Sequence, residues 1–333
     1  MYELRFGVAD LGRVRFAVSP LWEAMAAVRV LVDPPSRSYH LPWLEAVRPM
    51  LDDLDLAPLT ALQPRRGYTP DFPMPAPVRA LPDVRDQLAQ VRATPLNQVH
   101  AEVTRALSER SGEPVPAGAQ DLLTDPTRTR SRIVDALESV WEQLIAPHWP
   151  VLRDLLEADI SYHGRLLTDR GLEQLIPALH PLVRWTGEAV LIDQGQRHTR
   201  ELRGAGLLLM PSAFSWPAVT VVLDEPIQPT LVYPARGIAE LWQPATAATS
   251  DALARLMGRT RAKLLASLRH PATTTTLARR HDLAPATVSE HLTTLRGAGL
   301  VTARRHRSQL LYRHTALGEQ LVDGAPATDG GLP

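Results

Sequence analysis

The stretch ATVSEHLTTLRGAGLV, residues 286–301, combines two patterns in one segment. Val288, Leu292 and Leu295 recur at the spacing that places side chains on one face of a helix. The residues between them are short or polar, and two glycines then end the helix before an apolar pair begins a new segment. The pattern predicts a helix with one apolar face that packs and one small polar face that can approach a partner closely.

The segments on either side of this helix follow one another closely. Hydrophobic spacing predicts helices over 252–257, 260–268, 275–281 and 315–322, and two hairpin strands over 300–304 and 309–313. A tight turn at Leu283-Ala284 precedes Pro285, which stands at the first helical position, where its missing N–H costs nothing. Helix, short helix, turn, helix and hairpin is the order of a winged helix-turn-helix, whose second motif helix enters the major groove of DNA.

The polar helix face and the hairpin tip supply the expected DNA contacts. These residues are Thr287, Ser289, Glu290, Thr293 and Thr294 on the helix, and Arg304, Arg305 and Arg307 at the tip. A threonine can offer its methyl group to thymine, a glutamate can accept from a cytosine amino group, and arginines suit phosphates or the adjacent minor groove. Ala284 runs against the pattern, because a capping Ser, Asp or Asn is usual there and its loss costs about 0.5–2 kcal/mol.

The same features have alternative interpretations. Helices with one apolar face are common, and an arginine-rich hairpin tip can simply be solvated. A winged helix can also serve as a dimerisation or protein-contact module. The agreement of helix order, turn, glycine stop, hairpin and local charge favours DNA binding.

Charge is distributed unevenly along the chain. Residues 1–250 hold 24 Arg against 30 Asp or Glu, a balance of −6, whereas residues 251–333 hold 12 Lys or Arg against 6 Asp or Glu, a balance of +6. A small basic module attached to a larger acidic one indicates that only the module meets a polyanion.

Residues 255–315 resemble the ArsR-type winged-helix regulators, in which a string like VSEHLTTLRGAGLV followed by a basic wing is the most recognisable part. Upstream, LLLMPSAFSWP, PTLVYPARGIAELW and ADLGRVRFAVSP resemble an actinobacterial group of these proteins with a long N-terminal domain of unknown function. The resemblance implies a homodimeric transcriptional regulator, often a repressor released by an effector. The family's metal-sensing branch carries a Cys-x-Cys pair on the helix expected at 275–281, where this chain reads TTTTLARRH. Thiolate metal sensing therefore does not carry over.

Length and composition limit the remaining choices. A chain of 333 residues predicts two or more domains, and its apolar runs are far shorter than a membrane span. The first residues lack the pattern of a secretion signal, so we expect a soluble, cytoplasmic protein without membrane contact. There is no cysteine, and the 11 histidines form none of the close pairs that zinc sites favour. We therefore expect neither a metal site nor another cofactor.

The region before the basic module predicts an α+β fold. Its first part has helical spacing in several pieces, including an apolar stripe from Ile133 to Leu144, and 188–233 contains short β-prone segments that predict a small, largely antiparallel sheet. We expect a regulatory or dimerisation domain over 1–242, a linker over 243–250, the winged helix over 251–323 and a disordered tail over 324–333. The string RGAGL occurs at 203–207 and again at 296–300, each time before an apolar strand, which indicates shared turn chemistry or coincidence.

Catalytic motifs are absent from the large domain. It contains no nucleophile elbow, no phosphate loop and no GxGxxG after a strand, so we do not expect an enzyme. A methyltransferase-like enzyme that dimerises through the winged helix is the alternative. For a small-molecule sensor, the candidate ligand residues are Trp185, Phe214, Trp216, Tyr233 and Arg236, because an arginine among aromatics can hold an acidic ligand. Two further interpretations remain open: these aromatics form only a core, and the domain only dimerises.

Overall fold

The computed structural model describes residues 1–32, 40–65, 67–110, 112–195, 197–224, 227–242, 251–269, 271–306 and 309–323. Contacts divide the chain into two units, Met1–Ile238 and Ala239–Pro333. The linker expected at 243–250, the tail expected at 324–333 and Arg307 of the expected wing lie outside the described residues.

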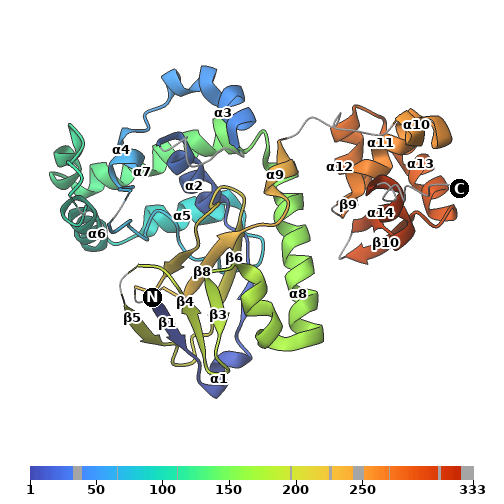
Figure 1. Ribbon diagram of the computed structural model, residues 1–333. Helices are drawn as coiled ribbons and strands as arrows, with labels where there is room; N and C mark the ends of the chain where they lie inside the picture. Colours follow the sequence, from blue (N-terminus) through green and yellow to red (C-terminus); the bar gives the residue numbers. More distant parts are fainter. Residues whose placement is uncertain are drawn as a thin grey trace, which may run out of the picture. The chain divides into compact units, whose positions relative to one another are not determined.

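The first unit contains more helix than strand (Figure 1). Its helices are α1 (Val8–Leu11), α2 (Pro20–Val32), α3 (Leu41–Val47), α4 (Ala57–Ala61), α5 (Val84–Ala93), α6 (Leu96–Ser108), α7 (Pro126–Val140) and α8 (Trp149–Leu179), and α9 (Ile238–Leu241) begins at its last residue. Short 3₁₀ helices at Arg48–Asp53 and Ala119–Leu123 and a π-helical turn at Trp141–Ile145 extend or link them. The apolar stripe from Ile133 to Leu144 runs along α7 and the π-helical turn and is buried as expected, since Ile133, Leu137 and Leu144 are all 0% exposed.

The strands of the first unit form two mixed sheets. They are β1 (Tyr2–Arg5), β2 (Arg15–Phe16), β3 (Val183–Trp185), β4 (Ala189–Ile192), β5 (His198–Glu201), β6 (Leu208–Ser212), β7 (Thr220–Val222) and β8 (Thr230–Pro234). One sheet has the order β3-β4-β1-β5, with β1 antiparallel to β4 and parallel to β5. The other has the order β2-β6-β8-β7, with β6 parallel to both β2 and β8. The α+β class is confirmed, but the single, largely antiparallel sheet is wrong.

The physical reason for this difference lies in the two central strands and the chain start. Every residue of β6 and of β8 is buried, and continuous apolar strands are typical of parallel pairs that are covered on both faces. Strands β1 and β2 join the sheets from the beginning of the chain, across about 190 residues of sequence, and such pairing leaves no local signal. Between them the sheets hold a core that includes Leu4, Leu209 and Leu231, each 0% exposed.

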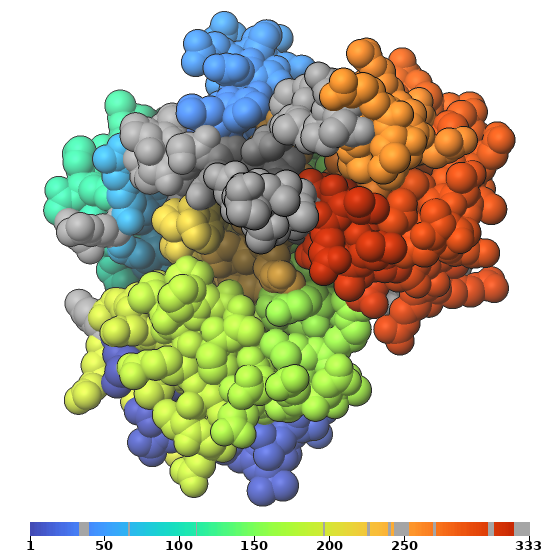
Figure 2. All heavy atoms as spheres, turned by 45° about the vertical axis from the view of Figure 1, so that its right-hand side comes forward, coloured from blue at the N-terminus to red at the C-terminus, as the bar shows by residue number. Residues whose placement is uncertain are grey.

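Helix α8 packs beside both sheets. It contacts β3 and β6, and in the space-filling view its green atoms lie next to the yellow-green atoms of β3 to β5 (Figure 2). The helix continues to Leu179 through a break at Gly171, whose φ of 69° is left-handed. Glycine adopts that conformation without strain, so the chain can change direction there and bury Leu175 and Ile176.

The second unit is small and follows the expected order. Its elements are α10 (Asp251–Met257), α11 (Arg259–Ala266), a 3₁₀ turn (Ser267–Arg269), β9 (Ala272–Thr273), α12 (Thr274–His281), α13 (Pro285–Gly297), β10 (Val301–His306), β11 (Gln309–His314) and α14 (Ala316–Asp323). The sheet order is β10-β11-β9, so a short third strand joins the expected hairpin. A core that includes Leu265, Leu277 and Leu292 holds the three central helices together.

Candidate nucleic-acid interface and ligand cavity

The turn before α13 is built by local backbone geometry. The side chain of Thr273 caps α12 by accepting the Thr276 backbone N–H at 3.1 Å. Asp282 ends α12 in the left-handed region with φ 52°, and the Leu283 N–H then donates to the Ala278 carbonyl at 2.9 Å. Pro285 opens α13 after Ala284, which makes no side-chain cap, as its side chain dictates.

Helix α13 presents the two faces that its sequence predicts. Val288 and Leu292 are 0% exposed and Leu295 is 2% exposed, so this face is sealed in the core. Ser289, Glu290, Thr293 and Thr294 are exposed, and Thr287 is half-buried.

Two threonine hydroxyls on the polar face are bonded within the helix. Thr293 Oγ1 donates to the Ser289 carbonyl at 2.9 Å, and Thr294 Oγ1 donates to the Glu290 carbonyl at 3.1 Å. Each hydroxyl proton is thereby engaged, which leaves the oxygen lone pairs and the methyl group for a partner. No described residue hydrogen-bonds or pairs with the carboxylate of Glu290, so this charge is available as well.

The hairpin places two of the expected arginines together. Arg304 pairs with Leu311 and Arg305 with Leu310 across β10 and β11, and both arginines are exposed. Strand β9 pairs with β11 through Ala272 and Tyr312, and its two residues are too few to form a periodic pattern that would predict it.

Three further basic residues lie at helix ends in this unit. Arg279 and Arg280 are exposed in the last turn of α12, and Arg296 is exposed in the last turn of α13. Cations at a helix C-terminus are favoured by the helix dipole, which gives these residues a structural role as well. Beside them, burial lowers the pKa of His281, and the positive charges of Arg280 and Lys263 lower it further.

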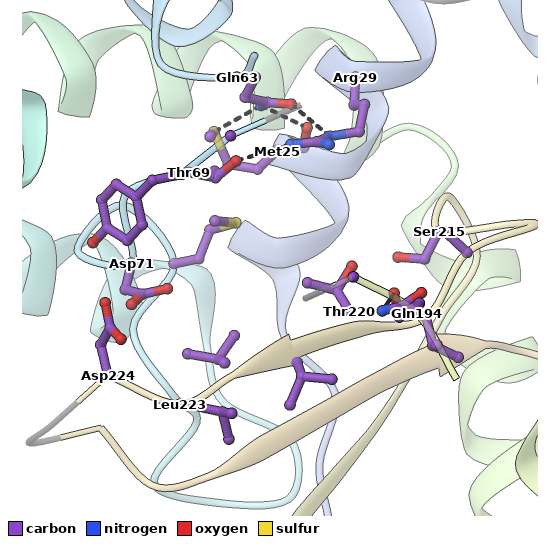
Figure 3. Close-up of a pocket in the computed structure, with 18 of the residues that line it drawn as sticks. Met25, Arg29, Gln63, Thr69, Asp71, Gln194, Ser215, Thr220, Leu223 and Asp224 are labelled. Atoms are coloured by element: carbon purple, nitrogen blue, oxygen red, sulfur yellow. Dashed lines mark hydrogen bonds between the residues drawn. The ribbon is translucent and has the colours of Figure 1, made fainter. Parts of the chain in front are cut away.

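The first unit contains a cavity of about 1060 Å³. Its wall comes from helices α2 and α6, from the loop that includes Tyr68 to Met74, and from the sheet segments around Gln194 and Thr220 (Figure 3). At one end Arg29 donates to Gln63 Oε1 at 3.3 Å and to Thr69 Oγ1 at 3.1 Å. Gln63 in turn donates to the Met25 carbonyl at 2.9 Å, so this end is a connected polar network.

Of the five candidate ligand residues, only Phe214 lines this cavity. Phe214 also packs into the core, stacked on His40 with ring centroids 4.9 Å apart. Trp185 packs edge-on against Phe6, and Trp216 is half-buried outside the cavity wall.

Tyr233 and Arg236 meet at Asp159 instead. Tyr233 Oη donates to Asp159 Oδ2 at 2.8 Å, and the Arg236 backbone N–H donates to Asp159 Oδ1 at 3.0 Å. The guanidinium of Arg236 lies over the Tyr162 ring, with its carbon 3.6 Å from the centroid. The predicted set is therefore spread over several environments and does not converge on one cavity.

A buried glutamate, Glu23, lies on α2 next to Trp22, which lines the cavity. Glu23 is 1% exposed and accepts the Ala213 backbone N–H at 3.0 Å. Burial raises the pKa of this carboxyl to about 7, although its hydrogen bonds act in the opposite direction. No motif pointed to Glu23, because a single glutamate in the helical segment LWEAM looks like an ordinary surface residue.

Residues 256–304 match a family model described as a helix-turn-helix domain. The second unit is a helix-turn-helix domain. Residues 83–239 match the model of a family of unknown function, DUF5937. Comparison with curated proteins and with solved structures gives no significant match.

The helix-turn-helix match makes the chain a DNA-binding regulator in general terms. It favours a regulator over the methyltransferase-like alternative. Only part of the cavity wall comes from residues 83–239, which match the family of unknown function. The narrower ArsR-type assignment and the actinobacterial grouping stay predictions.

No three His, Asp or Glu side chains among the described residues are grouped as a metal ion requires. Within the same residues, no helix is both long and apolar enough to span a bilayer.

Proposed function

We propose that this protein is a sequence-specific transcriptional regulator that binds a palindromic operator as a homodimer, acts as a repressor, and senses a small molecule in its first unit. The observation that carries this proposal is the exposed polar face of α13, on a helix sealed behind by Val288 and Leu292, in a domain that matches helix-turn-helix proteins. A helix of this form can enter the major groove with its small side chains against base edges.

Base recognition is proposed for Thr287, Ser289, Glu290, Thr293 and Thr294, and phosphate or minor-groove contacts for Arg304, Arg305 and Arg307. Glu290 is the sharpest of these, because an unpaired carboxylate accepts from a cytosine amino group and is repelled by phosphates. Its removal should relax specificity more than it weakens binding.

The test is binding of the purified protein to DNA from its own upstream region, compared with scrambled DNA over a salt series. We expect selective binding with a steep salt dependence, and Glu290→Ala should narrow the ratio of operator to scrambled affinity by roughly fivefold to a hundredfold, the range of 1–3 kcal/mol for one base contact. Glu319→Ala, an exposed glutamate on α14, is the matched control and should leave the ratio unchanged. Equal affinity of the wild type for both DNAs would refute sequence-specific recognition.

The homodimer is supported by an exposed apolar residue on the first helix of the second unit. Leu256 on α10 is 74% exposed, and burying such a side chain against a second copy would stabilise a dimer. Leu256→Glu should give a monomer in light scattering, whereas Leu310→Glu, at a leucine 40% exposed on β11, should remain a dimer. A wild-type monomer, both alone and on DNA, would contradict this part of the proposal.

A sensor role is supported by the cavity, because about 1060 Å³ is ample for a drug-sized molecule and its wall mixes apolar side chains with a few polar groups. A ligand that binds the cavity and releases the protein from its operator would support a repressor controlled by an effector. Ligand binding that leaves operator affinity unchanged would separate the cavity from regulation.

A further inference from the structure

The wall of the large cavity is chemically divided. An apolar part of the wall, called the apolar middle below, includes Trp22, Met74, Phe214 and Val222. Met25 lies beside Gln63, and Leu223 lies next to Asp224 (Figure 3). Aromatic and methionine side chains form adaptable surfaces for flat or bulky apolar groups. The two ends of the cavity differ in charge.

Carboxylates gather at the end near Tyr68. Asp71 follows Tyr68 on the same loop, and Asp224 lies opposite it, with the two carboxylates near each other in the cavity (Figure 3). Glu102 on α6 stands behind Asp71 and accepts the backbone N–H groups of Asp71 and Phe72 at 2.8 and 2.9 Å.

One arginine is present at this end, and it is already engaged. Arg105 donates to Asp224 at 2.5 Å and to Glu109 at 3.2 Å, and its guanidinium lies 3.8 Å from the centroid of the Tyr68 ring. No described residue donates a hydrogen bond to the carboxylate of Asp71 or forms an ion pair with it. The acidic end therefore has more negative than positive charge, and the excess is centred on Asp71.

The opposite end does not offer an equivalent site for an anion. Arg29 is directed to Gln63 and Thr69 by its hydrogen bonds, and Arg197 is exposed to solvent, where a charge contact is weak. The cavity thus offers an apolar middle and one half-buried carboxylate that lacks a partner.

We propose that this cavity binds an amphipathic organic cation, with its positive centre beside Asp71 and its aromatic or aliphatic body against the apolar middle. This inference rests on the sensor role proposed above and names the chemical class of its effector. A cation beside Asp71 replaces the charge partner that the protein lacks, and the Tyr68 ring adds a favourable face for it. An anion of the same shape would meet Asp71, Asp224 and Glu102 and be repelled.

The protonation of Asp71 provides a second signature. Burial, together with the negative charges of Glu102 and Asp224, raises the pKa of Asp71 to about 7, while the charge of Arg105 acts in the opposite direction. A cation binds the ionised form, so affinity should increase from pH 6 to pH 8. The remaining titratable or charged groups on the cavity wall are Tyr2, Tyr68, Arg29, Glu109, Arg197 and His198.

Tetraphenylphosphonium and tetraphenylborate provide a matched test, because they have nearly the same size and shape and opposite charge. Calorimetry on the full chain without DNA should show binding of the phosphonium and at least about tenfold weaker binding of the borate. Asp71→Asn should lower phosphonium affinity by about tenfold and abolish its pH dependence, which separates Asp71 from His198. Asp52→Asn removes an exposed carboxylate outside the cavity and should change neither quantity.

The outcomes distinguish this inference from the regulator itself. Equal binding of the two ions, binding of neither, or an unchanged affinity in Asp71→Asn overturns the cation site, whatever the DNA measurements show. If the wild-type protein binds the phosphonium but does not bind DNA selectively, the proposed regulator is overturned and the cation site is not. Circular dichroism and operator binding of Asp71→Asn without ligand check that the variant is folded.

Discussion

The polar face of α13 and the cavity of the first unit both present a carboxylate without a described partner, Glu290 in one and Asp71 in the other. Glu290 belongs to a single continuous helix, whose 13 residues carry both the packing face and the contact face. Asp71 acquires its surroundings from segments as distant as α2, α6 and the loop after β7. A contact surface on one helix is encoded locally, whereas a cavity wall exists only once the chain has folded.

Removal of a core side chain from α13 should give the largest effect. Leu292 is 0% exposed in the core of the second unit, so Leu292→Ala should destabilise that unit by about 2–5 kcal/mol. If the second unit and the cavity of the first unit fold independently, Leu292→Ala should lose operator binding and keep phosphonium binding. Thr293→Ala, its exposed neighbour, is the control, and chemical denaturation measures both. If Leu292→Ala also lost phosphonium binding, the two units would not be independent.

Ionisation of Glu23 in the first unit should change the free energy of unfolding by a similar amount. The pKa of Glu23 rises from 4.5 to about 7 in the folded chain, so the unfolded chain binds fewer protons between these values. Stability should therefore fall as pH rises from about 4.5 to 7, by about 3 kcal/mol from this group alone. Glu23→Gln should flatten that part of the pH profile, and Glu142→Gln, an exposed glutamate, should not. Urea unfolding at pH 5 and pH 8 checks this, and identical profiles for wild type and Glu23→Gln would rule out the buried ionisation.

The wing should contribute less to DNA affinity than α13 does, and its contribution should not depend on the DNA sequence. Arg305→Ala should weaken binding to operator and scrambled DNA alike and reduce the slope of log affinity against log salt by about 1. Anisotropy titrations from low to moderate salt measure this slope. Arg203→Ala provides a control at an exposed arginine of the first unit. An unchanged slope in Arg305→Ala would remove the wing from the interface.

The smallest change concerns the missing cap of α13. Ala284 has the extended backbone of a capping residue but no side-chain hydrogen bond, so Ala284→Ser should stabilise the second unit by about 0.5–2 kcal/mol. The reverse case in the first unit is Asp125, whose side chain accepts the backbone N–H groups of Thr127 and Arg128. Asp125→Ala removes this cap and should destabilise the first unit by a similar amount. Thermal denaturation measures both, and a neutral Ala284→Ser would show that another group already satisfies the helix start.

The sequence predicted the second unit nearly element by element because each element there carries its own periodicity or turn residue. The repeated string RGAGL shows both the success and the limit of such local information. Gly206 and Gly299 occupy the same place in the two copies and have φ values of 69° and 71°, so the residue that leads into the next strand is left-handed in both. Arg203 and Gly204 are also left-handed, whereas Arg296 and Gly297 are helical. Identical residues therefore adopt different structures where tertiary contacts differ.

The candidate ligand set failed to converge for a related reason. Aromatic residues are as common in cores as in binding sites, and their proximity in sequence did not indicate which side of the sheet each would face. Tyr233 ends on Asp159, and Trp185 ends on Phe6. Asp71 carries no sequence signal, because its unusual environment depends on burial and on Glu102 and Asp224, which lie 31 and 153 positions further along the chain.

The internal hydrogen bonds of Thr293 and Thr294 affect what α13 can detect. With both hydroxyl protons held by helix carbonyls, these side chains present carbon and lone pairs to whatever lies in front of them. If α13 contacts base edges as we propose, such a surface would distinguish thymine from uracil, and 5-methylcytosine from cytosine, by one methyl group. Methylation at C5 of cytosine alters neither Watson–Crick pairing nor the phosphates, yet a helix of this kind would detect it directly.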